Sequence, residues 1–213
     1  LGKGVNKDSK KAINWYLKAV KQGESQAQND MGKIFVEGLG VKKSTFTAMS
    51  MFTEAAQNGN TDAQGNLGRL FFTDILQDIK KEFKSNGQKE LNGRRSWPEI
   101  EKFIKEKGFV KNPIEGEKWL LLAAEKGSAS SQFNLAELYL NGFNEKEGFL
   151  TKQIIEKDHA KANKFLKLSV AQKNADAELL LGYQYLYGNN DLNKDLKKAE
   201  KYLRLAVEEY PSQ

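Results

Sequence analysis

The chain has 213 residues, enough for one or two domains that bury a hydrophobic core. It contains no cysteine and a single histidine, His159, so disulfides, thiolate metal sites, a cysteine nucleophile and zinc sites built from several histidines are excluded. The 34 basic and 28 acidic residues give a net charge of +6, and this excess is too diffuse to indicate a nucleic-acid partner. We therefore expect no cofactor, no metal and no catalytic centre based on histidine.

The first predicted helix covers residues 8–22 and begins a pattern that recurs along the chain. Four positions repeat at a spacing of 36 residues, namely Ala12 and Ala48, Ala19 and Ala55, Gly23 and Gly59, and Ala27 and Ala63. A fixed period of this length is typical of repeat proteins in which each repeat is one helix pair. Because the first helix has no predicted partner before it, we expect an exposed apolar edge there, covered by an upstream repeat in a longer protein.

Each following repeat begins with a first helix that carries a small residue and, three positions later, an aromatic residue. The small residues are Gly32, Gly68, Ala136 and Gly182. A small side chain lets a neighbouring helix approach closely, and the aromatic residue lies on the same helix face beside it. The pattern therefore predicts packing between helices.

The second helix of each repeat has an apolar stripe at helical spacing, as in Trp119, Leu120, Ala123 and Ala124. Residues suited to cap its start precede it in every repeat, namely Asp8, Ser44, Asn112, Asp158 and Asp195. Gly23, Gly59 and Gly127 are suited to end three of these helices. We therefore predict helix boundaries from cap chemistry as well as from periodicity.

Two insertions interrupt the repeats, at residues 73–109 and 143–157. The first predicts a helical hairpin: one amphipathic helix contains Ile79 and Phe83, and Ser96 to Glu99 form a capping box that starts a second. Arg94, Arg95 and Trp97 are its candidate contact residues, because insertions in repeat proteins tend to lie on one face and to bind partners. The alternative is a solvated decoration that covers the edge formed by Phe71 and Phe72.

The repeated residues resemble the Sel1-like repeat, a relative of the tetratricopeptide repeat. The best copies are residues 26–59 and the opening half-repeat. The resemblance implies an all-α fold, an α-solenoid of antiparallel helix pairs wound into a right-handed superhelix, here with an inserted helical hairpin. We expect a single solenoid over residues 1–213, made of a half-repeat 1–23 and repeats at about 24–59, 60–127, 128–173 and 174–210.

Related tetratricopeptide repeats bind ligands in a groove lined by their first helices, so the resemblance implies a similar groove here. The positions that would line it are Lys33, Arg69, Phe72, Phe133, Glu137, Leu140, Tyr183, Leu186 and Tyr187. The aromatic members favour a protein interface, because aromatic side chains bury a large area with few rotors. The alternative is that these side chains pack against the next repeat or the insertion.

The resemblance implies a non-enzymatic protein-binding scaffold or adaptor of bacterial origin. An alternative is an immunity or inhibitor protein that neutralises a secreted effector toxin, with the basic insertion meeting an acidic surface. In both cases the partner is another protein or peptide rather than nucleic acid, and the oligomeric state stays open. No window reaches the about 18 apolar residues of a membrane span, and no targeting segment is present, although the resemblance favours a periplasmic or secreted location.

Overall fold

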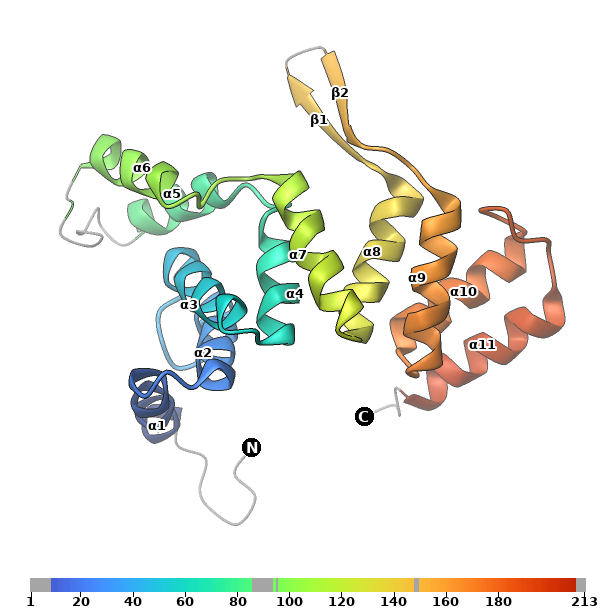
Figure 1. The fold of residues 1–213 in the computed structure, drawn as a ribbon, viewed down its shortest axis with the longest axis horizontal. Coiled ribbons are helices and arrows are strands. Elements are labelled where there is room, and N and C mark those ends of the chain that lie inside the picture. The colour runs from blue at the N-terminus through green and yellow to red at the C-terminus, as the bar shows by residue number, and fades with distance from the viewer. Residues whose placement is uncertain (1–8, 86–93, 95, 148–149, 210–213) are drawn as a thin grey trace. The chain divides into compact units, whose positions relative to one another are not determined.

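The computed structural model describes residues 9–85, 94, 96–147 and 150–209. The described part consists of helix pairs and one two-stranded hairpin, which confirms the predicted all-α solenoid class (Figure 1). The helices are α1 (Ser9–Lys21), α2 (Ser25–Glu37), α3 (Thr45–Gln57), α4 (Thr61–Leu70), α5 (Ile75–Ser85), α6 (Trp97–Glu106), α7 (Pro113–Glu125), α8 (Ala129–Asn141), α9 (His159–Ala171), α10 (Ala175–Tyr187) and α11 (Leu196–Glu209). Within these described residues, no helix is both long and apolar enough to cross a membrane.

The chain divides into two compact units, Leu1–Gly116 and Glu117–Gln213. In the first unit α2 packs on α3 and α3 packs on α4, and in the second α8 packs on α9 and α10 on α11. The centres of both units are apolar, with Met31, Met49 and Leu67 enclosed in the first and Leu135 and Leu166 in the second. Each unit therefore buries a core of its own.

The first helix, α1, presents a large apolar side chain to solvent. Trp15 is 68% exposed, and the Nζ of Lys18 lies 4.2 Å from the centre of its ring. Leu17 is also exposed. The predicted exposed apolar edge is therefore present on this helix.

Helix boundaries follow the predicted cap residues. The Ser44 side chain accepts a hydrogen bond from the backbone N–H of Thr47, and Asn112 accepts from that of Glu115. Gly59 and Gly127 have φ of 85° and 91°, a conformation that suits glycine because other residues crowd their own Cβ there. The cap predicted at Asp8 lies outside the described residues.

Two of the small residues in the first helices, Gly32 and Gly182, are sites of close helix approach. A Cβ atom placed on Gly32 would lie 2.5 Å from the ring of Phe52 on α3. A Cβ on Gly182 would lie 2.8 Å from the side chain of Leu203 on α11. Glycine is therefore required at both positions by packing between the two helices of one repeat.

The first insertion forms the predicted helical hairpin of α5 and α6. Its apolar faces are buried, with Ile75, Ile100 and Ile104 fully enclosed. The hairpin is attached to the start of α3, where the Glu82 carboxylate accepts hydrogen bonds from the backbone N–H of Thr45 at 2.8 Å and from its hydroxyl at 2.6 Å. A carboxylate at a helix N-terminus is favoured by the helix dipole. The insertion is therefore packed on the repeat.

The second insertion contains a β-hairpin, which the sequence analysis did not predict. Strands β1 (Phe143–Glu147) and β2 (Leu150–Ile155) pair antiparallel, with Glu145 opposite Lys152. The hairpin extends from the C-terminal end of α8 and the N-terminal end of α9 (Figure 1). At its base a Cβ on Gly142 would lie 2.9 Å from the carbonyl oxygen of Ile155, so the two chain segments approach closely there.

Two aspartates cap helices of the second unit. The backbone N–H of Lys161 donates to Asp158 and that of Lys198 donates to Asp195, and these hydrogen bonds hold the pKa of both carboxyls below the ordinary 3.8. Protonation removes the favourable charge at the helix N-terminus, so this stability is present above pH 3.8 and is lost as pH falls through the lowered pKa.

We predict that the double variant Asp158→Asn, Asp195→Asn loses less thermal stability than the wild type between pH 5 and pH 3, because an amide caps at every pH. Thermal unfolding followed by circular dichroism at several pH values measures the difference. Parallel curves for the two proteins would contradict a role for these caps in acid sensitivity.

Candidate partner-binding site

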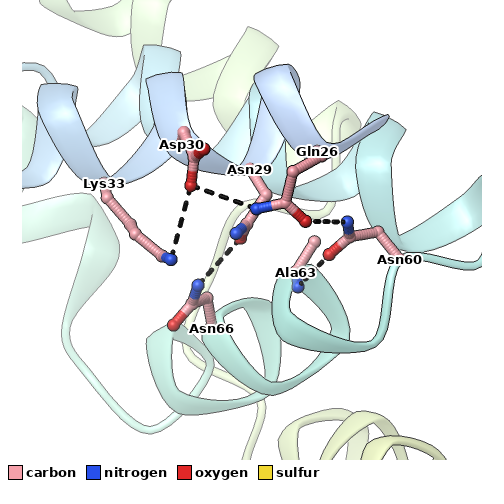
Figure 2. A network of polar contacts seen from close by, with 7 residues as sticks. All are labelled: Gln26, Asn29, Asp30, Lys33, Asn60, Ala63 and Asn66. Carbon is pink, nitrogen blue, oxygen red and sulfur yellow. Dashed lines mark hydrogen bonds and ion pairs between the residues drawn. The ribbon is translucent and has the colours of Figure 1, made fainter. Parts of the chain in front are cut away.

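The first helices of the first unit, α2 and α4, are joined by amides (Figure 2). The Asn66 Nδ2 donates to Asn29 Oδ1 at 2.9 Å, and Asn29 is fully buried. One turn earlier, Asn60 Nδ2 donates to Gln26 Oε1 at 3.0 Å, while Asn60 also caps α4 through the N–H of Ala63. These bonds fix how the two helices lie beside each other.

The predicted groove residues Lys33 and Arg69 lie on the exposed sides of these helices. The Lys33 ammonium lies 3.5 Å from the Asp30 carboxylate, which also accepts from Gln26 Nε2 (Figure 2). The third residue predicted for this unit, Phe72, is half-buried, and its ring lies 2.7 Å from the position a Cβ would take on Gly116. Lys33 and Arg69 are therefore accessible to solvent, whereas Phe72 contributes to packing.

The second unit presents a different face on α10. Leu179, Tyr183 and Tyr187 are 37%, 46% and 65% exposed, and we call these three residues the tyrosine ridge. The rings of Tyr183 and Tyr187 lie 6.4 Å apart between centres and 13° from parallel. Positions separated by four and eight residues fall on one helix face, so the ridge is a continuous apolar strip along α10.

The other groove residues predicted for this unit occupy varied positions. Glu137 is exposed on α8 and Phe133 is half-buried. Leu140 is 8% exposed and lies in the apolar interior. Leu186 is half-buried and lines a hollow together with Leu203 on α11. The tyrosines are thus the exposed aromatic residues among the predicted contacts in this unit.

The candidate residues of the first insertion are engaged within the hairpin. The guanidinium carbon of Arg94 lies 3.7 Å from the centre of the Phe103 ring. The Trp97 ring lies 6.1 Å from that of Phe83, and the Lys80 Nζ lies 5.4 Å from Trp97. Arg95 lies outside the described residues. Arg94 and Trp97 therefore stabilise the hairpin, whether or not they also contact a partner.

A structural glutamine that was not among the predicted residues recurs in the first helices. Gln64 Nε2 donates to the carbonyl oxygen of Ala56, and Gln132 Nε2 donates to that of Ala124, both at 3.1 Å. Both glutamines are buried and satisfy a carbonyl at the end of the preceding second helix. Their signal was available, because Gln28 and Gln64 follow the repeated Ala27 and Ala63.

Two polar contacts in the second unit have the geometry of structural pairs. The Tyr139 hydroxyl donates a hydrogen bond to Glu117 at 2.6 Å. Burial is the main cause that raises the pKa of Tyr139 above its usual range, and this hydrogen bond is the second. His159 Nδ1 lies 3.4 Å from the Asp191 carboxylate. Among the described residues, no cluster of three or more histidines and carboxylates could hold a metal ion.

Comparisons with known proteins agree with the helix pairs. The profile of the Sel1 repeat matches residues 1–24, 25–60, 105–128, 129–174 and 175–209. The matched segments leave out residues 61–104, which contain α4, α5 and most of α6. No curated protein sequence matches this chain.

Two crystal structures with a similar fold come from bacteria. A Sel1 repeat protein from Oxalobacter formigenes has a TM-score of 0.69 and 24% identity over 95% of this chain. An immunity protein from Pseudomonas aeruginosa has a TM-score of 0.52 and 18% identity, also over 95% of this chain. The present chain spans 64% of the length of the first and 61% of the second.

Proposed function

Because the chain belongs to the Sel1 repeat family, we propose that it is a non-enzymatic scaffold that binds another protein through the tyrosine ridge of its second unit. The exposure of Tyr183 and Tyr187, at 46% and 65%, is the observation that carries this proposal. Tyrosine is enriched at interfaces, because its ring buries a large apolar area while its hydroxyl still finds a polar partner.

The arrangement of the ridge supports binding rather than packing within the chain. Tyr185, on the same helix, stacks on Tyr202 of α11 with ring centres 6.0 Å apart. Tyr183 and Tyr187 stack only on each other among the described aromatic rings. Because they are already held nearly parallel, less side-chain freedom is lost when a partner covers them.

The polar groups of the second unit support a binding function without catalysis. Tyr139, whose pKa is raised by burial, lies away from solvent and donates a hydrogen bond to Glu117. The chain offers no cysteine and one histidine to nucleophilic chemistry. A surface that binds another protein therefore accounts for the exposed tyrosine ridge better than a reaction centre does.

Affinity capture tests the proposal. The immobilised wild-type chain and the variant Tyr183→Ala, Tyr187→Ala are exposed to lysate and envelope fractions of the source organism, and bound proteins are quantified by mass spectrometry. We predict that the double variant retains less than about a tenth of the specific partner, because truncating two interface tyrosines removes anchors of at least 1–2 kcal/mol.

The matched control is Leu168→Ala, which removes a 43% exposed apolar side chain from α9. It should capture the same partner as the wild type. Circular dichroism of all three proteins confirms that each is folded. Equal capture by the tyrosine variant and the wild type would refute binding through the ridge.

A second candidate function is an immunity or inhibitor protein, the role named for the Pseudomonas structure of similar fold. The exposed basic residues of α5, such as Lys81 and Lys84, would then face an acidic toxin. This function predicts one tightly bound partner that is lost with Lys81→Glu, Lys84→Glu and retained by the tyrosine variant. Arg94 is left unchanged in this test, because it packs on Phe103.

A further inference from the structure

The two first helices of the second unit contain no basic residue. Helices α8 and α10 have 13 residues each, and their charged side chains are Glu137, Asp176 and Glu178. The whole chain has 34 basic residues among 213, so this absence is a local departure from a basic background. Glu178 is buried, whereas Glu137 and Asp176 are exposed. The exposed face of these helices is therefore acidic.

Among the helices of this unit, the basic residues lie on the second helices, and further lysines such as Lys126, Lys173 and Lys194 lie in the connecting segments. Helix α9 carries lysines at three positions and α11 carries four basic residues, namely Lys161, Lys164, Lys167, Lys197, Lys198, Lys201 and Arg204. In the first unit the first helices are not depleted in this way, since α2 carries Lys33 and α4 carries Arg69. Charge in the second unit is thus separated by helix type.

The tyrosine ridge lies within this acidic face. Asp176 precedes Tyr183 by seven residues and Tyr187 by eleven, so the carboxylate and both rings lie on one side of α10. Glu137 on α8 occupies the repeat position of Tyr183, because each directly follows the small residue of its helix. Carboxylates and aromatic ring faces both attract cations, the first by charge and the second through the ring quadrupole.

The second unit already places lysines over several of its other rings. Lys161 lies 5.0 Å from the centre of Tyr139, Lys198 lies 5.0 Å from Tyr185 and Lys201 lies 5.4 Å from Tyr202. Within the described part of the chain, no lysine or arginine takes this position over Tyr183 or Tyr187. The two most exposed rings of the unit therefore carry no cation from the described part of the chain.

We propose that the first-helix face of the second unit, α8 and α10, binds an arginine- and lysine-containing segment of the partner protein, whose cations stack on Tyr183 and Tyr187. This inference rests on the proposed function and specifies the chemistry of its partner. Arginine is preferred over lysine, because the planar guanidinium stacks on a ring while its N–H groups pair with a carboxylate. The partner segment is therefore basic, in contrast to the acidic surface expected from the overall charge.

Peptides of defined charge test the inference on the full chain. Three acetylated and amidated peptides contain four repeats of Arg-Gly-Ser, Lys-Gly-Ser or Glu-Gly-Ser, and binding is followed by nuclear magnetic resonance titration. The arginine peptide should bind most tightly and shift amide signals of α10, and the glutamate peptide should not shift them. The net charge of +6 by itself favours the opposite order, so nonspecific attraction cannot produce this result.

Three variants separate the contributions. Tyr183→Ala, Tyr187→Ala should weaken the arginine peptide about tenfold, while Tyr183→Phe, Tyr187→Phe should keep most of the affinity, because phenylalanine retains the ring face. Asp176→Lys should weaken it about threefold, with a smaller effect at high salt. Leu168→Ala is the control and should leave binding unchanged. Equal binding of the arginine and glutamate peptides, or an alanine variant that binds as the wild type does, would overturn the inference.

Competition separates this inference from the proposed function. The arginine peptide should displace the captured partner from the wild-type chain. A partner that is lost with the alanine variant but is not displaced by the arginine peptide would overturn the basic segment and leave the scaffold intact. Capture that is unchanged in the alanine variant would count against the scaffold function itself, whatever the peptides do.

Discussion

Replacing Gly116 by valine is expected to lower the free energy of unfolding by about 2–4 kcal/mol and the melting temperature by roughly 5–15 °C. A Cβ atom on Gly116 would lie 2.8 Å from the backbone carbonyl oxygen of Gly68 and 2.7 Å from the ring of Phe72. The carbonyl belongs to the last turn of α4 and cannot rotate away as a side chain could. The first turn of α7, which belongs to the same unit as α4, must therefore move to accept any side chain at Gly116.

Helix propensity alone would favour replacing Gly116, so a loss of stability on replacement would report the close packing at this position. Glycine inside a helix costs about 1 kcal/mol relative to alanine, so Gly116→Ala would stabilise α7 if space were available. Because the first atom of any side chain already overlaps backbone, we expect Gly116→Ala to be destabilising as well, by less than valine. Thermal unfolding of both variants, followed by circular dichroism, measures the balance.

The matched control for these variants is Ala12→Val. Ala12 occupies the same repeat position in α1 but is exposed to solvent, so valine there costs only its small helix propensity. Equal melting temperatures for Gly116→Val and the wild type would show that the two helices have room to move apart. That outcome would contradict the close approach of α4 and α7.

The packing at Gly116 shows which features of a helix contact can be predicted from the sequence. Gly116 stands at the start of a second helix, where the other repeats have the buried Ala48, Ala162 and Ala199. The reason for glycine in one repeat was not available, since it depends on the carbonyl of Gly68 and the ring of Phe72. Periodicity identifies the buried face of a helix, but the distance to the neighbouring helix requires the structure.

Of the two insertions, the structure of the first could be predicted from the sequence and that of the second could not. The capping box and apolar spacing predicted α5 and α6, because these signals lie within one helix. The β-hairpin at 143–155 had no such signal, since its strands are short and mostly polar. The attachment of Glu82 to Thr45 joins residues 37 positions apart, and no local pattern predicts a contact of this kind.

The candidate site shows a similar limit. First-helix positions taken from the resemblance include the exposed Tyr183 and Tyr187, but also Leu140, which is buried. Position within a repeat indicates the helix face, whereas accessibility also depends on what packs nearby. The separation of charge between α8 with α10 and α9 with α11 could have been counted from the sequence once helix boundaries were known.

Replacing Phe46 by alanine is expected to lower the free energy of unfolding by about 3–5 kcal/mol and to loosen the α5–α6 hairpin. The Phe46 ring is 8% exposed, and its centre lies 5.6 Å from that of Phe103 and 5.7 Å from that of Phe109. It thus joins α3 to the inserted helices through one aromatic cluster. Its removal leaves a cavity between the repeat and the insertion.

Hydrogen exchange and urea unfolding together distinguish a docked hairpin from an independent one. In a docked hairpin, Phe46→Ala lowers the urea midpoint and speeds exchange of amides in α5 and α6. The control Leu39→Ala removes a 56% exposed side chain from the same unit and should change the free energy by less than about 0.5 kcal/mol. Unchanged exchange in α5 and α6 would mean that the inserted helices keep their structure without α3.

Because Glu82 still holds Thr45 in this variant, the additional change Glu82→Gln should speed exchange further, as the charge at the start of α3 is then lost.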